Sequence, residues 1–466
     1  MKNKKIKTPQ IQGQNKMGVM PVGKLLFTMS VPLIISMLVQ AMYNVVDSYF
    51  VAKLSNAALN AVSLAFPIQT LMIAFSVGTG VGMNSYIARC LGMGEGERAN
   101  RGASNGMFLL FVTALVFTVM SFFIEPFFRL FTDDAELIGL GVDYLRICMV
   151  FCMGIFLQIG CERILQSMGK NSASMLTQLI GAIVNIILDP LLIFGIGPFP
   201  ELGIKGAAYA TVIGQWIGMA AAILLVFAGK HEIKVSFKGF RPDKNAIGEI
   251  YRVGAPSIIM QSITSVMTIG LNAIFARILL SEIGVSITGV YFKIQSIIFM
   301  PVFGLTNAAM SIMAYNFGAR NRLRFASAFK RTLLTAMAIM LIGLAIFQII
   351  PGQIVQMFDK DGTLTKAGAI AFRIISLSFP IAAVGITIST AFQSVGKGMH
   401  SMIMSVLRQL GALLPIALIL ALVFRTIDSV WWAFFIAEFA SFTYGVFMLR
   451  KTWKEHIEIL PDGAAV

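Results

Sequence analysis

The chain has 466 residues, of which 57% are hydrophobic and only 13% are charged. Soluble domains carry about 25% charged residues, so the composition excludes an ordinary soluble protein and indicates a chain that crosses a lipid bilayer many times. The formal net charge of +15 would suggest nucleic-acid binding in a soluble protein. Here we expect the basic residues to follow membrane topology, and we predict no nucleic-acid partner.

Twelve apolar runs are long enough to cross a bilayer, which needs roughly 20 residues per helix. The clearest is 107–124, which contains no charged residue. The predicted spans are 24–52, 58–88, 102–124, 140–167, 172–196, 205–228, 250–279, 286–314, 326–350, 367–394, 400–424 and 429–450.

Basic residues are concentrated on one side of the predicted membrane. Most of the 37 Lys and Arg fall in the N-terminal tail, in the connections that follow even-numbered spans, and in the C-terminal tail. Because cytoplasmic loops are enriched in Lys and Arg, we predict that both termini are cytoplasmic. Residues 1–23 lack the apolar core of a signal peptide, and the four cysteines and three histidines show no zinc-site or disulfide spacing.

An internal repeat divides the chain into two halves. Leu-Gln-Ser-Met-Gly-Lys at 165–170 recurs as Phe-Gln-Ser-Val-Gly-Lys at 392–397. An even number of spans per half gives both repeats the same orientation, and substrate then binds between the halves. The predicted units are an N-terminal tail 1–23, a six-helix lobe 24–228, a cytoplasmic linker 229–249, a second six-helix lobe 250–450 and a C-terminal tail 451–466.

Two carboxylates lie inside apolar spans of the first half. Asp47 has no basic residue close to it in the first span, and Asp189 follows Asn185 by one helical turn on the same helix face. Pro190 lacks an N–H, so the carbonyl of Ile186 loses its usual donor. Carboxylates in a membrane mark ion or proton pathways, and clustered oxygens suit hard cations.

Helix length places both acids in the outer half of the membrane, so we expect Asp47 and Asp189 to pair and titrate as one unit. The alternative for Asp47 is that it caps its helix at the headgroup level. The corresponding positions of the second half carry no carboxylate, which predicts that only the first lobe holds the coupling ion.

Other charges and polar groups also fall within or near spans. Glu438 and Lys293 are the buried charges expected in the second lobe, where we predict that they pair across helices in a structural role. Glu162 and Arg163 are expected to form an ion pair at the inner interface. The substrate-binding candidates are polar residues of the half that holds the acids, namely Gln40, Asn44 and Gln69.

Several motifs stand out together: Pro32, Tyr43-Asn44-x-x-Asp47-x-x-Phe50, Phe66-Pro67-Ile68, Asn185-x-x-x-Asp189-Pro190 and the duplicated Gln-Ser-x-Gly-Lys. Over residues 20–450 they resemble the multidrug and toxic compound extrusion (MATE) family, in its bacterial MepA-type and DinF-type branches. Another branch of that family has an acidic residue in its seventh span, whereas residues 251–280 contain none.

The resemblance implies an all-α membrane protein with twelve transmembrane helices in two pseudo-symmetric six-helix lobes. It implies a monomer in the bacterial cell membrane that exports cationic lipophilic drugs or dyes in exchange for H⁺ or Na⁺, with no cofactor. It also places the coupling site on Asp47, Asn185 and Asp189, with Tyr43 adjacent. Na⁺ is the only metal ion that the resemblance implies for this site.

Three other functions share part of the pattern. A flippase or exporter of a lipid-linked or metabolite substrate would use the same architecture, but pyrophosphate needs a strongly cationic cleft. An intramembrane aspartyl protease would need a Gly-x-Gly-Asp motif, which the sequence lacks. A channel would need a selectivity ring, which two unequal halves supply poorly. The prediction is therefore a transporter and not an enzyme.

Overall fold

The structure is a computed structural model that describes residues 15–129, 132–228, 231–359 and 362–462. Within these ranges every regular element is a helix. Ten helices are long and apolar enough to cross a membrane, and two bent pairs each complete one more span, which gives twelve. The predicted fold class, an all-α polytopic membrane protein, is confirmed.

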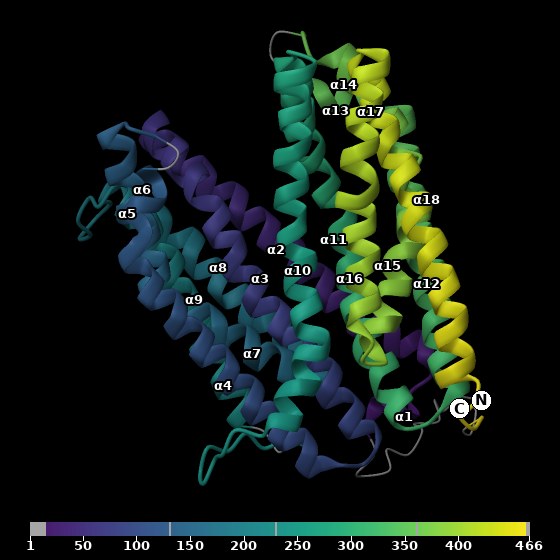
Figure 1. Cartoon of the computed structure of the whole chain (residues 1–466). Coiled ribbons are helices and arrows are strands. Elements are labelled where there is room, and N and C mark those ends of the chain that lie inside the picture. Colours follow the sequence, from purple (N-terminus) through teal and green to yellow (C-terminus); the bar gives the residue numbers. More distant parts are fainter. Residues whose placement is uncertain (1–14, 130–131, 229–230, 360–361, 463–466) are drawn as a thin grey trace, which may run out of the picture.

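The first bundle contains the first six spans (Figure 1). After the short α1 (Lys16–Val19), its elements are α2 (Val22–Leu54), α3 (Asn56–Gly92), α4 (Gly96–Met120), η1 (Ser121–Phe123), α5 (Ile124–Arg129), α6 (Ala135–Val150), α7 (Met153–Ser167), α8 (Asn171–Phe194) and α9 (Ile204–Phe227). The fourth span is not one straight helix, because α6 and α7 meet at an angle of 45°.

The second bundle repeats this plan (Figure 1). Its tenth span bends by 48° where the fourth does, and a π-helical segment, η3, interrupts the eleventh. Its elements are α10 (Lys244–Ala273), η2 (Ile274–Ile278), α11 (Glu282–Gly318), α12 (Arg322–Ile349), α13 (Pro351–Gln356), α14 (Thr365–Ser376), α15 (Phe379–Ser394), α16 (Gly398–Val406), η3 (Leu407–Leu413), α17 (Leu414–Phe424), α18 (Ile427–Thr452) and η4 (Trp453–Ile457).

The linker between the bundles is shorter than the predicted 229–249. The Asp243 side chain accepts hydrogen bonds from the backbone N–H groups of Asn245 and Ala246, so α10 already begins at Lys244. Such N-caps satisfy backbone donors that have no partner inside the helix. The described part of the linker lies along α4, where the N–H of Lys234 donates to Asn100.

The two bundles meet at one end, which we call the closed end, and separate toward the opposite end (Figure 1). Helix α3 packs against α10 and α11, and α2 packs against α11. Glycines permit this approach: a Cβ on Gly82 would lie 2.1 Å from the carbonyl oxygen of Ile250, and one on Gly92 would lie 1.9 Å from that of Tyr315. Small residues allow such close helix crossings in membranes.

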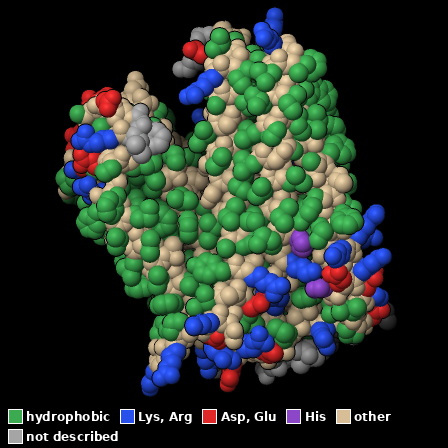
Figure 2. Space-filling model, in the orientation of Figure 1, with side chains coloured by type: hydrophobic (Ala, Val, Ile, Leu, Met, Phe, Trp, Pro, Cys, Tyr) green, Lys and Arg blue, Asp and Glu red, His purple; other side chains and the backbone are tan. Residues whose placement is uncertain are grey.

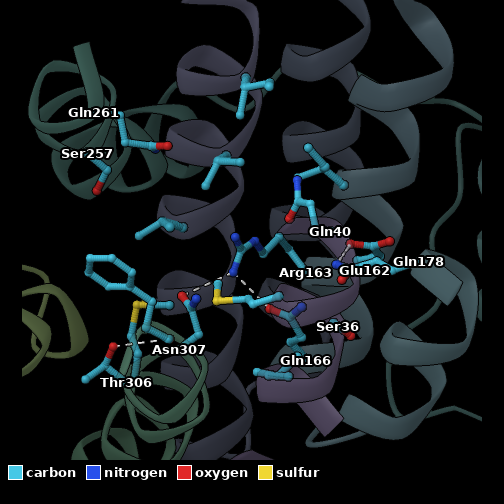
Figure 3. A pocket seen from close by; sticks show the side chains of 18 of the residues that line it. Ser36, Gln40, Glu162, Arg163, Gln166, Gln178, Ser257, Gln261, Thr306 and Asn307 are labelled. Carbon is cyan, nitrogen blue, oxygen red and sulfur yellow. Dashed lines mark hydrogen bonds between the residues drawn. The ribbon is translucent and has the colours of Figure 1, made fainter. Parts of the chain in front are cut away.

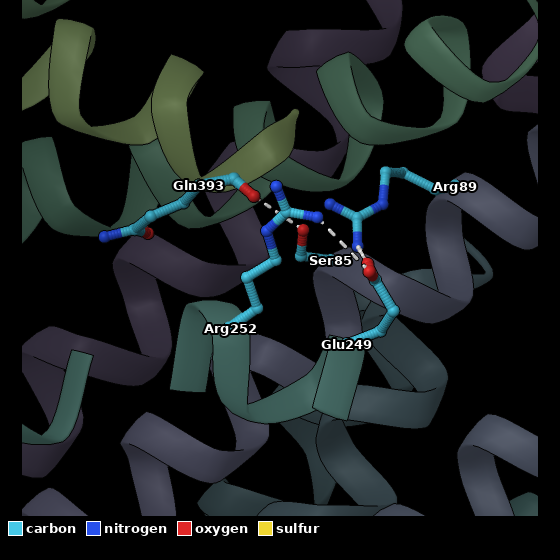
Figure 4. A network of polar contacts seen from close by, with 5 residues as sticks. All are labelled: Ser85, Arg89, Glu249, Arg252 and Gln393. Carbon is cyan, nitrogen blue, oxygen red and sulfur yellow. Dashed lines mark hydrogen bonds and ion pairs between the residues drawn. The ribbon is translucent and has the colours of Figure 1, made fainter. Parts of the chain in front are cut away.

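A polar network also ties the bundles together at the closed end (Figure 4). Arg89 of α3 pairs with Glu249 of α10 at 3.3 Å, and Glu249 pairs with Arg252 at the same distance. Ser85 donates to the backbone oxygen of Gln393 in α15 at 2.6 Å. These contacts connect one span of the first bundle to two spans of the second.

The distribution of charge distinguishes the two ends of the molecule. Figure 2 shows hydrophobic side chains along the flanks of both bundles, with many Lys and Arg gathered at the closed end. Both ends of the described chain lie at this same end (Figure 1). The flanks therefore form an apolar belt of the kind that faces lipid, bounded by a basic surface.

Candidate transport cavity and ion site

A cavity of about 510 Å³ lies between the bundles and is lined by both. Its first-bundle wall includes Gln40, Tyr43 and Asn185, and its second-bundle wall includes Gln261 and Asn307. Apolar side chains and four methionines complete the lining: Met37, Met260, Met310 and Met404. Methionine is flexible and polarizable, so such a wall adapts to ligands of different shape.

The predicted acidic residues lie in the first bundle, toward the end opposite the closed end. Asp189 lies in the last two turns of α8 and is fully buried, and Asn185 is 3% exposed. The Asn185 Nδ2 donates to Asp189 Oδ1 at 3.4 Å and to the hydroxyl of Thr211 at 3.3 Å. The structure brings Asp47 of α2 within electrostatic range of Asp189.

Three buried oxygens of this cluster have no hydrogen-bond donor among the described residues. They are Oδ1 of Asp47, Oδ1 of Asn185 and Oδ2 of Asp189. A buried acceptor without a partner costs about 1–3 kcal/mol, so the cluster fits a group that supplies positive charge. A proton or a hard cation such as Na⁺ meets this requirement, because both bind to oxygen.

Two residues connect this acidic cluster to the cavity. Tyr43 and Asn185 line the cavity wall, whereas Asp47 and Asp189 do not belong to its lining. Tyr43 interacts electrostatically with both carboxylates. An ion bound at the acids would therefore be separated from a ligand in the cavity by a single layer of side chains.

The three predicted substrate-binding residues occupy different places. Gln40 lines the cavity (Figure 3). Asn44 is exposed and outside the lining, since successive residues on a helix point about 100° apart and Tyr43 faces the cavity. Gln69 also lies outside the lining and donates to the Tyr144 hydroxyl at 3.1 Å, which joins α3 to α6.

The predicted pairing of Glu438 with Lys293 is wrong. Glu438 of α18 pairs instead with Arg408 of η3, at 3.2 Å, because η3 packs directly against α18. The Lys293 side chain is exposed on α11, and it takes part in no ion pair among the described residues. Arg408 itself lines the cavity.

The predicted ion pair between Glu162 and Arg163 is also wrong, although both side chains are buried and line the cavity. As neighbours on α7 they point in different directions (Figure 3). Glu162 accepts hydrogen bonds from three neutral side chains, those of Gln158, Thr177 and Gln178, at 3.1, 3.0 and 2.6 Å.

Arg163 instead donates through Nη1 to Gln166 at 2.9 Å and to Asn307 of the second bundle at 3.4 Å. A signal for this polar face was present in the sequence. Gln158, Glu162 and Gln166 recur every four residues, which places them on one side of a helix.

Two helical bundles around a shared polar cavity, with buried carboxylates beside it, define a membrane transporter. The MatE family model matches residues 32–191 and 256–419, one match in each bundle. The chain therefore belongs to the MATE family of transporters.

Similar proteins include transporters with different cargo. The FAD transporter of Shewanella oneidensis is 27% identical over 404 residues, which cover 85% of this chain and 88% of the relative. The multidrug export protein MepA of Staphylococcus haemolyticus is 25% identical over 89% of this chain and 90% of its own.

Solved structures share the whole fold. An outward-facing multidrug resistance MATE transporter has a TM-score of 0.90 and 25% identity, covering 96% of this chain and 99% of the other. A transporter from Pyrococcus furiosus, described as having a binding pocket of reverse polarity, has a TM-score of 0.88 at 25% identity. The match covers 96% of this chain and 100% of the other.

Proposed function

We propose that this protein is a secondary active multidrug exporter that moves amphipathic organic cations out of a bacterial cell in exchange for H⁺ or Na⁺. The observation that carries the proposal is the position of the three unpartnered oxygens of Asp47, Asn185 and Asp189 beside the cavity, which Asn185 itself lines. The relatives named multidrug export protein MepA support multidrug export.

Coupling between ion binding and drug binding follows from Asn185 and Tyr43, which line the cavity and also interact with the acidic cluster. When bound, the ion supplies the positive charge that the two carboxylates lack. Asn185 and Tyr43 then face a cluster with one negative charge fewer, so their orientation in the cavity wall changes. The first bundle would thus bind either the ion or the cationic drug favourably, which is the requirement for exchange.

We place the closed end in the cytoplasm, because it carries the basic surface and both ends of the described chain. The bundles then separate toward the outside, as an exporter requires at the stage of release. In this proposal the protein works as a monomer, since both walls of the cavity come from one chain. It needs no cofactor beyond the coupling ion and is not an enzyme.

Ethidium efflux from proteoliposomes, under H⁺ and Na⁺ gradients imposed separately, tests this function. We expect one gradient to drive efflux, and Asp189→Asn to remove the gradient-dependent part. Asp143→Asn is the matched control, because Asp143 is an exposed carboxylate of the same bundle paired with Lys205 at 3.2 Å. Efflux by Asp189→Asn at the rate of Asp143→Asn would exclude the proposed site.

A second candidate function is export of a metabolite on the same fold. Its support is the second-bundle wall of the cavity, where hydroxyl and amide side chains such as Ser257, Gln261, Asn307 and Ser389 suit a polar ligand. The relative named FAD transporter has the same architecture at 27% identity. Competition of ethidium efflux by FAD distinguishes the two, because an exporter of lipophilic cations alone leaves ethidium efflux unchanged.

A further inference from the structure

The guanidinium of Arg163 lies in the cavity without a carboxylate partner. Nη1 donates to the amide oxygens of Gln166 and Asn307. No carboxylate lies within ion-pair distance of Arg163 among the described residues, although the adjacent buried Glu162 interacts with it electrostatically. Nε and Nη2 are not among the buried atoms that lack a partner. The charged group therefore has donors free on the side that faces the cavity (Figure 3).

The other charged groups of the cavity are already satisfied. Arg408 pairs with Glu438, and Glu162 accepts three hydrogen bonds from neutral side chains. A buried guanidinium that contacts no carboxylate loses hydration that a neutral amide oxygen replaces only in part. Arg163 is thus the charged group of the cavity that still has hydrogen-bond donors available for an anionic partner.

From this arrangement we propose that Arg163 and Asn307 form a subsite for the carboxylate or phosphate group of an amphipathic substrate. This inference rests on the proposed export through the cavity and names a substrate class, amphipathic cations that also carry an anionic group. A planar guanidinium offers parallel N–H donors that match the two oxygens of a carboxylate.

Asn307 adds a donor from the opposite bundle. Its Oδ1 accepts from Arg163, so its Nδ2 is directed elsewhere, and no described residue accepts from it. Since Arg163 belongs to α7 and Asn307 to α11, an anion held by both would bridge the two bundles. Gly80 leaves room for the Arg163 stem, because a Cβ there would lie 2.8 Å from its Cγ.

The test compares two dyes that differ in one group, rhodamine 110 with a free carboxylate and rhodamine 123, its methyl ester. Binding to the purified full-length protein in lipid nanodiscs is measured by fluorescence anisotropy at pH 7.5 without any ion gradient. We expect rhodamine 110 to bind about tenfold more tightly than rhodamine 123, the effect of one charge-assisted pair.

Arg163→Gln is expected to abolish this tenfold ratio while retaining rhodamine 123 binding. Asn307→Asp keeps the arginine but supplies an internal carboxylate to it, and it should reduce the ratio in the same way. Arg129→Gln, which removes an exposed arginine paired with Glu125, is the control and should keep the ratio.

Equal affinities of the two dyes in the unaltered protein would overturn the subsite, as would a ratio that survives in either Arg163→Gln or Asn307→Asp. If one of the two variants misfolds, the other still tests the subsite. The comparison of the two dyes in the unaltered protein requires no variant at all. Because binding is measured without a gradient, failure of ethidium efflux would refute the proposed function and leave this result standing.

Discussion

The amide of Asn185 donates to one oxygen of Asp189 at 3.4 Å, while the other oxygen of Asp189 and the amide oxygen of Asn185 are buried without donors. The pair is therefore half satisfied. Asp47 adds a third such oxygen on the neighbouring helix α2, whose contact with α8 brings the two acids together. An arrangement with more buried acceptors than donors is stabilised when something positive binds to it.

The two acids are expected to act as one unit. Asp47→Asn and Asp189→Asn should each reduce gradient-driven ethidium efflux by about tenfold or more, because either change removes a charge that the coupling ion needs. The double variant should be scarcely worse than either single one, since residues of one interaction network are not additive. Initial rates in proteoliposomes at matched protein content give this comparison.

The contrary result is additivity. If the loss in the double variant equals the product of the two single losses, Asp47 and Asp189 work independently, and the shared ion site is rejected. If the three variants and the unaltered protein have equal thermal unfolding midpoints in detergent, the loss of efflux comes from coupling and not from folding.

The ion pair of Arg408 and Glu438 is expected to stabilise the second bundle. Both side chains are largely buried, at 28% and 13% exposed, so Glu438→Gln leaves a guanidinium without its counter-charge in a poorly solvated place. Removing one partner of a buried pair costs about 3 kcal/mol. We expect a lower unfolding midpoint and yield, measured by thermal denaturation in detergent, with a ratio of H⁺- to Na⁺-driven efflux that does not change.

Lys293→Gln is the matched variant for this prediction, because Lys293 is an exposed cation of the same bundle. It should unfold at the midpoint of the unaltered protein. An unfolding midpoint that falls for Lys293→Gln but not for Glu438→Gln would restore the pairing predicted from the sequence.

The twelve spans and the acidic cluster were predictable because both depend on local patterns. A carboxylate in an apolar run stands out wherever it occurs, and Asp47 and Asp189 could be assigned similar depths from helix rise alone. The spacing of Asn185 and Asp189 placed them on one helix face, where the structure also has them.

The partners across helices were not predictable in the same way. Arg163 lies close to the end of a predicted span, so counting residues assigned it to the membrane surface. The bend between α6 and α7 and the π-helical η3 change the direction of the fourth and eleventh spans. The contacts between side chains of different helices therefore depend on how the helices cross. Packing between distant segments of the chain sets these crossings.

The last prediction concerns the closed end, where glycines allow α3 to contact α10 and α11. Gly92→Ala would place a methyl group 1.9 Å from the carbonyl oxygen of Tyr315, a distance that forces the helices apart. We expect this variant to weaken the packing of the two bundles at the closed end, and so to reduce the efflux that depends on closing this end.

Gly96→Ala is the control at the same end, because a Cβ on Gly96 meets no atom within 4 Å. Since an exporter that cannot close toward the cytoplasm loses its outward-facing state, Gly92→Ala should lose ethidium efflux, whereas Gly96→Ala should keep it. Efflux retained by Gly92→Ala would show that the α3–α11 contact adjusts to the methyl group without opening this end.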